Sequence, residues 1–233
     1  SNIFISQCNT SYKRNKICPT RIIYWRPFQM IENLTQKKNF KFVVHKDDFL
    51  TEKRCDELID MFSKSEQYKA TVAGTYKGNG SDVVNENVRK VQEVRFSEDI
   101  VLSDGFNLNK NLTMACEMAN TLFFNFDTSN QLSNIRMLRY EDTGKYDWHL
   151  DIGNEETSVR KITAIVQLSD ENDYEGGNFE FSMTDETGKD TAVGSRKKGS
   201  LILFPSYLGH RVSPLMSGVR YSILTWMLGN AFK

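Results

Sequence analysis

Short runs in which apolar residues alternate with polar ones recur along the second half of the chain, from residue 134 onward. Segments rich in Gly, Asp, Ser and Thr separate these runs, and such segments are typical of turns. Alternation with a period of two predicts β-strands. We predict six strands here: 135–140, 148–152, 162–168, 178–183, 200–204 and 220–228. Many short strands with regular turns favour a sandwich, jelly roll or barrel.

The first half of the chain carries two helical patterns. Thr51 is a good N-cap, and apolar residues follow it at helical spacing: Cys55, Leu58, Ile59 and Phe62. The pattern over 112–126 predicts a second, buried helix, whose apolar face is expected to be Met114, Met118, Leu122 and Phe126. Strands are predicted at 22–25, 40–44 and 88–96. Helices first and strands later suggest that the helices pack outside a β core.

Residues 1–21 are polar and basic, and we expect them to form a loose arm. The remainder, 22–233, is expected to fold as a single domain, mainly β with flanking helices, with its chemistry in 134–229. Segment 65–90 is polar and contains glycines, so it is either a lid over a site or a plain surface loop.

The composition is that of an ordinary globular protein, with 39% hydrophobic and 26% charged residues. Lys and Arg together number 30, as do Asp and Glu, so the formal net charge is zero. A non-specific nucleic-acid binder usually carries a basic surplus, which this chain lacks. No apolar run reaches 18 residues, which disfavours a membrane partner. Four scattered cysteines without a CxxC motif favour a reducing, cytoplasmic setting.

Two of the three histidines form a pattern with one aspartate. His149 and Asp151 are two residues apart on a predicted strand, so their side chains are expected to point the same way. His210 follows an apolar strand that ends at Pro205, and it is expected to come from another strand across the barrel. Two imidazoles and one carboxylate hold one face of an octahedral ion and leave the other face open. On ligand softness alone, iron(II), manganese and zinc all remain candidates.

Arg220 opens the last predicted strand, and alternation places it on one face with Ser222, Leu224 and Trp226. A buried guanidinium on an apolar strand needs an anionic partner, because an unpaired buried charge is costly. The guanidinium fork fits a carboxylate, so a dicarboxylate co-substrate would serve. An internal pair with Asp or Glu is the alternative. Four aromatic residues either line a substrate mouth or pack in the core: Tyr146, Trp148, Tyr174 and Tyr207.

These residues resemble the iron(II)- and 2-oxoglutarate-dependent dioxygenases, specifically the prolyl 4-hydroxylase-like branch, over roughly residues 42 to 229. The segment from Arg139 to Asp151 is similar to the family's Tyr-x3-Gly-x4-His-x-Asp pattern. Further segments resemble its first helix, its acidic-Gly-Gly turn, its distal-histidine segment and its co-substrate strand: 48–59, 174–179, 198–212 and 218–226. Collagen-type members usually have lysine where Arg220 stands, so a collagen-type substrate does not follow.

The resemblance implies a distorted double-stranded β-helix, a jelly-roll relative. It implies that iron(II) is bound by His149, Asp151 and His210, and that Arg220 binds the far carboxylate of 2-oxoglutarate. Further residues are expected to contact the co-substrate or wall its pocket: Tyr140, Ser222, Thr163 and Trp226. No catalytic residue is expected beyond the metal ligands. O2 is the implied oxidant and ascorbate the implied reductant.

The expected reaction is hydroxylation of an unactivated C–H bond, with succinate and CO2 as co-products. Asp151 argues against halogenation, because halogenating relatives lack this carboxylate. A prolyl residue in a protein or peptide is the first choice of substrate, which rests on the resemblance alone. A free amino acid or other small molecule, an alkylated nucleobase, a zinc hydrolase and a non-catalytic jelly-roll binding module are the alternatives. The sequence leaves the oligomeric state open.

Overall fold

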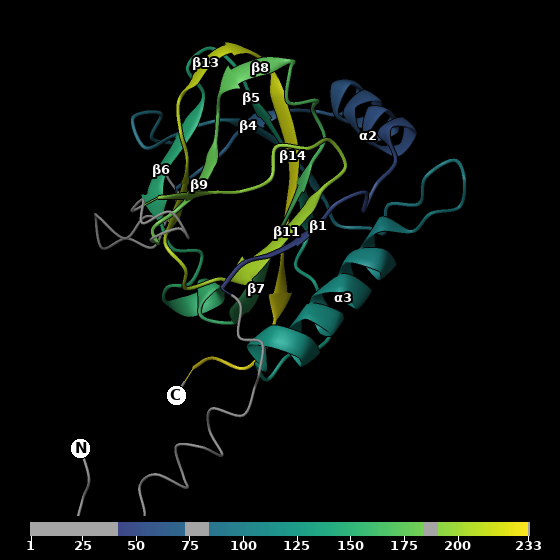
Figure 1. Cartoon of the computed structure of the whole chain (residues 1–233), viewed down its shortest axis with the longest axis vertical. Coiled ribbons are helices and arrows are strands. Elements are labelled where there is room, and N and C mark those ends of the chain that lie inside the picture. The colour runs from purple at the N-terminus through teal and green to yellow at the C-terminus, as the bar shows by residue number, and fades with distance from the viewer. Residues whose placement is uncertain (1–41, 73–83, 184–190, 233) are drawn as a thin grey trace, which may run out of the picture. The chain divides into compact units, whose positions relative to one another are not determined.

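The computed structural model describes residues 42–72, 84–183 and 191–232, all within one compact unit. Its largest sheet has seven antiparallel strands in the order β1-β11-β7-β14-β5-β4-β2 (Figure 1). In that order the strands are Val44–Lys46, Leu201–Pro205, Arg160–Gln167, Arg220–Leu228, Ile135–Tyr140, Gln92–Phe96 and Tyr68–Lys69. The central strands β7, β11 and β14 are buried on both faces, which is why they consist largely of apolar residues.

A second sheet has five strands in the order β10-β9-β12-β6-β3. These strands are Ala192–Val193, Phe179–Phe181, His210–Val212, Lys145–His149 and Arg89–Lys90, and β8 (Tyr174–Gly176) pairs separately with β13 (Leu215–Gly218). Side chains from both sheets share one apolar core, in which the rings of Phe181 and Phe204 meet at 5.1 Å. Two antiparallel sheets closed around a common core form the expected jelly roll, so the predicted fold class is confirmed.

Helices α2 (Glu52–Lys64) and α3 (Leu108–Ala119) lie on the other face of the seven-stranded sheet (Figure 1). A second apolar core fills this layer, and in it the Phe62 ring of α2 meets Tyr221 of β14 at 5.5 Å. Two short turns, η1 (Asn120–Phe124) and η2 (Glu155–Thr157), complete the described helical elements. None of the helices in the described ranges is long and apolar enough to cross a membrane.

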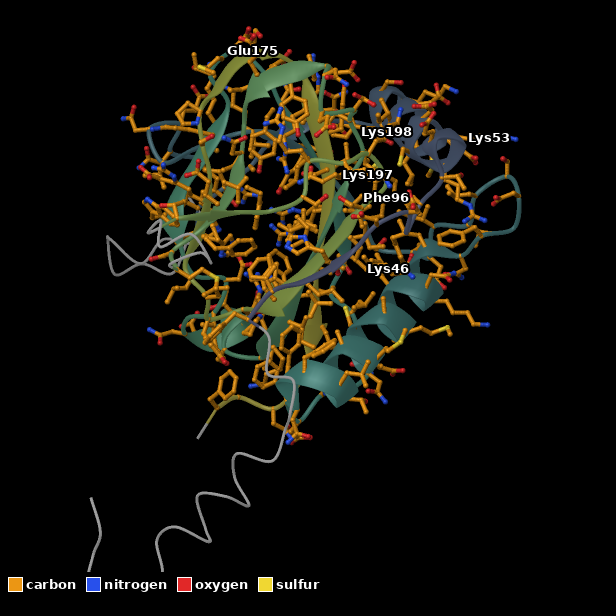
Figure 2. All side chains as sticks on the ribbon, in the orientation of Figure 1. Lys46, Lys53, Phe96, Glu175, Lys197 and Lys198 are labelled. Atoms are coloured by element: carbon orange, nitrogen blue, oxygen red, sulfur yellow. The ribbon has the colours of Figure 1, made fainter. Side chains whose placement is uncertain are left out.

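Helix α2 begins as predicted, since the Thr51 hydroxyl accepts a hydrogen bond from the Arg54 backbone N–H at 3.4 Å. Its buried face consists of Cys55, Leu58 and Phe62. An ion pair also ties the helix to the segment before β11, because Lys198 Nζ lies 2.6 Å from Asp56 Oδ1. Figure 2 shows Lys198 beside α2.

The predicted face of the second helix is wrong. Met114, Met118 and Leu122 are all more than half exposed, and the buried residues of α3 are Leu108, Leu112, Cys116 and Ala119. The helix begins four residues earlier than predicted, which adds Leu108 to the buried stripe. It then loosens into the π-helical turn η1, which ends at Asn125 with φ 59°. Leu122 and Phe126 therefore do not continue the helical stripe.

Strand bounds differ from the prediction in two instructive places. Segment 88–96 is two strands, because β3 joins the smaller sheet and β4 joins the larger one. Strand β6 ends at His149, so Asp151 follows the strand instead of lying within it. Segment 65–90 contains the short strand β2, while 73–83 lie outside the described residues. The predicted arm 1–21 and strand 22–25 also lie outside them.

Candidate metal centre

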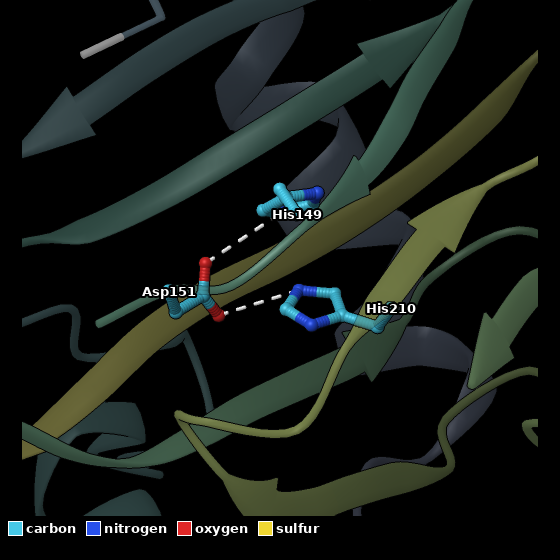
Figure 3. Close-up of side chains that lie close together, drawn as sticks. All are labelled: His149, Asp151 and His210. Atoms are coloured by element: carbon cyan, nitrogen blue, oxygen red, sulfur yellow. Dashed lines mark ion pairs between the residues drawn. The ribbon is translucent and has the colours of Figure 1, made fainter. Parts of the chain in front are cut away.

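His149, Asp151 and His210 converge at one end of the β6–β12 pair. The two histidines are directly opposite each other in this antiparallel pair, and Asp151 comes two residues after β6. Nε2 of His149 lies 3.6 Å from Oδ1 of Asp151, and Nε2 of His210 lies 3.4 Å from Oδ2 (Figure 3). One ligand atom from each residue lies within 4.8 Å of the others. This grouping is compact enough for one metal ion.

Backbone carbonyls orient both imidazoles. Nδ1 of His149 is 2.7 Å from the carbonyl oxygen of Asp147, and Nδ1 of His210 is 2.8 Å from that of Leu208. In the neutral rings, each Nδ1 therefore carries the proton and donates it to the carbonyl. The Nε2 lone pairs are left facing Asp151, which is the arrangement typical of metal-binding histidines.

Hydrogen bonds fix both the side chain and the backbone of Asp151. The Thr163 hydroxyl on β7 donates to Oδ2 at 2.7 Å and lies 3.1 Å from the Ser206 hydroxyl. The backbone N–H of Asp151 donates to the Ser206 carbonyl at 3.0 Å. These contacts fix the carboxylate after the strand has ended, so Asp151 reaches the two histidines without the regular geometry of a strand.

Burial by itself would raise the pKa of the Asp151 carboxyl. The two imidazoles and the Thr163 hydroxyl outweigh burial and hold the pKa well below its usual range. Burial lowers the pKa of His210 to about 4, against the attraction of Asp151. Asp151 is therefore ionised and His210 neutral at neutral pH, which are the forms of these side chains that bind metal ions.

A cavity that opens to solvent adjoins the three side chains. Its walls are mostly apolar and come from both sheets: Leu138, Ile165, Phe179, Val212 and Leu224. Two rings press against the imidazoles, with Tyr146 stacked on His149 at 3.5 Å and Phe179 on His210 at 5.3 Å. An apolar pocket with a few polar groups at one place is the usual form of a small-molecule site.

Arg220 lies in the same cavity and is only 1% exposed. Its Nη2 donates to Oε1 of Gln167 at 2.9 Å, and its guanidinium carbon lies 5.2 Å from the Tyr140 ring centre. Its Nε and Nη1 are buried and have no hydrogen-bond partner within the described part of the chain. A buried cation with two unused donors is complementary to a carboxylate that comes from outside the protein. The residues present therefore fit both a divalent ion and an anionic co-substrate.

The other predicted site residues fall into two groups. Tyr140, Ser222 and Tyr146 line the cavity together with Arg220 and the three candidate ligands. Thr163 lies behind Asp151, and Trp226 is not among the described residues that line the cavity. Trp148 and Tyr207, expected either at the substrate mouth or in the core, are both 41% exposed and do not line the cavity. Tyr174 is buried in the core that the two sheets share.

Three residues at the site were not predicted: Gln167, Phe179 and Ser206. The sequence could have indicated Gln167, because it is a polar residue at the end of the apolar strand β7. It lies four residues after Thr163, so both side chains are expected on the same face of the strand. Phe179 follows the Gly176-Gly177 turn, but its position does not distinguish a cavity wall from ordinary core packing. Nothing in the local sequence separates Ser206 from a turn serine.

Comparisons with known proteins agree with this geometry. The family model described as the 2OG-Fe(II) oxygenase superfamily matches residues 135–228. A PKHD-type hydroxylase of Synechococcus sp. (strain CC9605) is 30% identical over 102 residues, which cover 44% of this chain and 45% of that protein. The chain thus matches about half the length of this relative. A PKHD-type hydroxylase of Shewanella sp. (strain MR-7) is 30% identical over 180 residues, covering 73% of this chain and 76% of that protein.

Solved structures share the fold at low sequence identity. A Pseudomonas putida prolyl-4-hydroxylase aligns with a TM-score of 0.58 and 18% identity, covering 80% of this chain and 92% of that one. A Trichoplax adhaerens prolyl hydroxylase, in complex with a hypoxia inducible factor peptide fragment, aligns with a TM-score of 0.61 and 16% identity, covering 87% and 92%. Together with the Shewanella relative, these matches show that the chain belongs to the 2OG-Fe(II) oxygenase superfamily and resembles its prolyl 4-hydroxylase-like members.

Proposed function

We propose that the protein is an iron(II)- and 2-oxoglutarate-dependent dioxygenase that hydroxylates an unactivated C–H bond. The observation that carries this proposal is the position of Arg220. Two of its nitrogens, Nε and Nη1, have no hydrogen-bond partner among the described residues, and the side chain lines the cavity that also holds His149, Asp151 and His210. A zinc hydrolase would need the three ligands but would have no use for a buried guanidinium beside them.

In this proposal each residue has a defined task. His149, Asp151 and His210 would hold iron(II) through two imidazole nitrogens and one carboxylate oxygen. Arg220 binds the far carboxylate of 2-oxoglutarate, and Gln167 fixes the plane of the guanidinium. The hydroxyl groups of Tyr140 and Ser222 offer hydrogen bonds along the co-substrate. Thr163 orients Asp151 from outside the cavity.

When bound, iron, 2-oxoglutarate and O2 supply the oxidising chemistry, with succinate and CO2 as the expected co-products. The protein contributes orientation and a low-water environment. The apolar walls limit the access of water to the cavity beside the three ligands, and the stacked Tyr146 and Phe179 rings limit rotation of the imidazoles.

A prolyl residue in a peptide or protein is the substrate that we propose. The support comes from the relatives, since the solved proteins with this fold include prolyl hydroxylases and one of them holds a peptide. Ascorbate is the expected reductant for iron. A cytoplasmic setting remains a prediction from the cysteine content.

The test is incubation with iron(II), ascorbate, 2-oxoglutarate and a library of proline-containing peptides under air. We expect succinate and a peptide mass gain of one oxygen atom, both lost without iron or without O2. Asp151→Ala should abolish both products, whereas Asp60→Asn, which removes an exposed carboxylate on α2, should not. Succinate formation at the wild-type rate by Asp151→Ala contradicts the ligand role. Turnover without O2 would point to a hydrolase.

A further inference from the structure

The aliphatic stem of Arg220 packs against a turn with two consecutive glycines, Gly176 and Gly177, named here the double-glycine turn. Gly176 ends β8 and Gly177 follows it, and both have positive φ angles, 70° and 56°. Glu175, the residue before them, marks the place of this turn in Figure 2. A Cβ atom on Gly177 would lie 3.3 Å from Cδ of Arg220 and 2.8 Å from Cδ1 of Leu215. The turn therefore approaches the Arg220 stem so closely that no side chain fits between them.

A second arginine holds this turn. Nη1 of Arg196 donates to the Gly176 carbonyl at 2.8 Å and to the side-chain oxygen of Asn178 at 2.6 Å. Its Nη2 donates to the carbonyls of Tyr174 at 2.9 Å and Glu171 at 3.1 Å. Arg196 belongs to the segment between β10 and β11, so its side chain ties a separate part of the chain to both sides of the double-glycine turn.

The four acceptors of these Arg196 hydrogen bonds are neutral oxygens: three backbone carbonyls and one side-chain amide. The guanidinium carbon of Arg196 also lies 4.2 Å from the centre of the Tyr174 ring. Glycine loses more conformational freedom on folding than any other residue, so two glycines in a row make an ordered turn costly. The hydrogen bonds from Arg196 offset this cost and hold the turn in one conformation. The contacts of Arg196 are thus those of a residue that fixes a backbone position.

The guanidinium group of Arg220 depends on such support from behind. Its Nη2 donates to Gln167, whereas Nε and Nη1 have no hydrogen-bond partner in the described part of the chain. One hydrogen bond leaves the group free to shift by rotation about the bonds of the stem. Gln167 restrains one edge of the guanidinium, and the double-glycine turn restrains the stem. Both restraints are needed to keep the unpartnered donors at a fixed place.

We infer that Arg196 is a positioning residue for co-substrate recognition, which acts through Gly177 on the stem of Arg220. This inference rests on the proposed function, because it assigns the far carboxylate of 2-oxoglutarate to Arg220. Neither Arg196 nor Gly177 is among the described residues that line the cavity. Their effect should therefore appear in the discrimination between co-substrates with and without a far carboxylate, and should leave the affinity for the metal ion unchanged.

The test compares the binding of two five-carbon acids, 2-oxoglutarate and 2-oxopentanoate, which has a methyl group in place of the far carboxylate. Dissociation constants are measured by calorimetry on full-length protein loaded with Mn(II), which gives a readout independent of turnover. The affinity for Mn(II) is measured separately by electron paramagnetic resonance. We expect wild-type protein to bind 2-oxoglutarate roughly 100-fold more tightly than 2-oxopentanoate, because only the dicarboxylate forms charge-assisted hydrogen bonds with Arg220.

Gly177→Ala should reduce this preference roughly tenfold, because the added methyl group must displace Leu215 and the Arg220 stem. Gly105→Ala is the matched control. Gly105 also has a positive φ, of 81°, but a Cβ atom there would meet nothing within 4 Å. The control therefore carries a similar backbone strain and should keep the full preference. Both variants should bind 2-oxopentanoate and Mn(II) as the wild-type protein does.

Arg196→Gln should also reduce the preference roughly tenfold, and Arg196→Lys should recover part of it, because an ammonium group can still donate to some of the carbonyls. Arg54→Gln is the matched control, since the Arg54 guanidinium also lies over a ring, 3.9 Å from the Phe106 centre, but on α2. It should keep the full preference. In protein that already carries Arg220→Gln, neither Arg196→Gln nor Gly177→Ala should reduce the preference further.

A full preference in Gly177→Ala or in Arg196→Gln overturns the inference, as does an equal loss of affinity for both acids in either variant. A comparable loss of preference in Gly105→Ala or Arg54→Gln also overturns it. Should Arg196→Gln not fold, Arg196→Lys takes its place and must show part of the loss. Equal binding of the two acids by wild-type protein removes the role assigned to Arg220 and overturns the inference. The proposed function fails separately, if iron-loaded wild-type protein that prefers 2-oxoglutarate forms no succinate from it.

Discussion

At the scale of the residue, Asp151 is the point at which most of the site meets. Its carboxylate faces both imidazoles and accepts the Thr163 hydroxyl, while its backbone binds Ser206 and Arg160. One short side chain therefore depends on β6, β7, β12 and the segment after β11. Disturbing any of these neighbours should change metal binding before it changes the fold.

Thr163→Val tests this dependence, because it keeps the shape of the side chain and removes the hydrogen bond to Asp151. We expect iron(II) affinity to fall by roughly 10- to 100-fold, measured by competition with a chelator. Thr225→Val is the matched control, since it removes a buried hydroxyl that donates to the Ser133 carbonyl at 2.9 Å, away from the ligands. Both variants should lose about 1 kcal/mol of stability. A similar loss of iron affinity in both would refute a specific role for Thr163.

Arg220→Gln removes the charge that we assign to co-substrate binding. The KM for 2-oxoglutarate should rise by roughly 10- to 100-fold, because the far carboxylate loses a charge-assisted pair of hydrogen bonds. Arg220→Lys should recover part of this loss. Initial rates of succinate formation over a range of 2-oxoglutarate concentrations provide the measurement. An unchanged KM in Arg220→Gln, with Arg139→Gln as the reference, would argue against the assignment.

The sequence indicates which side chains lie together where their spacing along the chain carries chemical information. A histidine and an aspartate two residues apart, with a later histidine at a strand start, are grouped in the structure as the sequence suggested. Gln167 and Ser206 could not be found in this way, because their roles depend on which strands become neighbours. The registers of β7 with β14 and β11 bring them to the site. Local sequence does not encode that pairing.

At the scale of the element, helix α3 has two apolar stripes, and the sequence pattern predicted the wrong one as the buried face. The methionine-containing stripe is as apolar as the buried one, but Leu108 and Leu112 are fully buried whereas Met114 and Met118 are 56% and 57% exposed. The start of the helix decides between the stripes. The Asn107 side chain caps it by accepting from the Lys110 backbone N–H at 2.8 Å. Recognising Asn107 as the N-cap would have identified the correct face.

Alanine substitutions on α3 measure the difference between its two faces. Leu112→Ala should lower the free energy of unfolding by about 2–5 kcal/mol, because it leaves a cavity in the core beneath the helix. Met118→Ala should change it by less than about 0.5 kcal/mol. Urea unfolding of both variants decides the matter. Comparable losses for the two would mean that the Met118 face is covered in solution.

At the scale of the whole molecule, the outer apolar layer protects two thiols. Cys55 and Cys116 are both 0% exposed, and burial raises their pKa values to about 11 and about 12. In a variant with Cys8→Ser and Cys18→Ser, we expect no thiol to react quickly with Ellman's reagent at pH 8, and two to react in urea. Rapid reaction of the folded variant would show that α2 or α3 opens easily.

The fold class of the molecule was more predictable than the pairing of its strands. Strand runs and turn signals after residue 134 identified a β core, and the early helices were placed outside it. The sequence did not reveal that residues 89–96 cross from one sheet to the other, because no glycine, proline or other turn signal separates the two strands. Val91, the residue between β3 and β4, is itself β-branched and typical of a strand. The segment is divided only by its tertiary pairing, because β3 pairs with β6 of the smaller sheet and β4 pairs with β5 of the larger one.

The facing positions of His149 and His210 on β6 and β12 have a consequence beyond chemistry. An ion bound by both histidines would link two strands of the smaller sheet at a place where their register is irregular. A ligand that binds only the folded chain stabilises it according to the ligand's free concentration. Under scarcity of the ion, such a protein would be degraded sooner as well as work more slowly. Its abundance would then follow the supply of its own metal without a separate sensor.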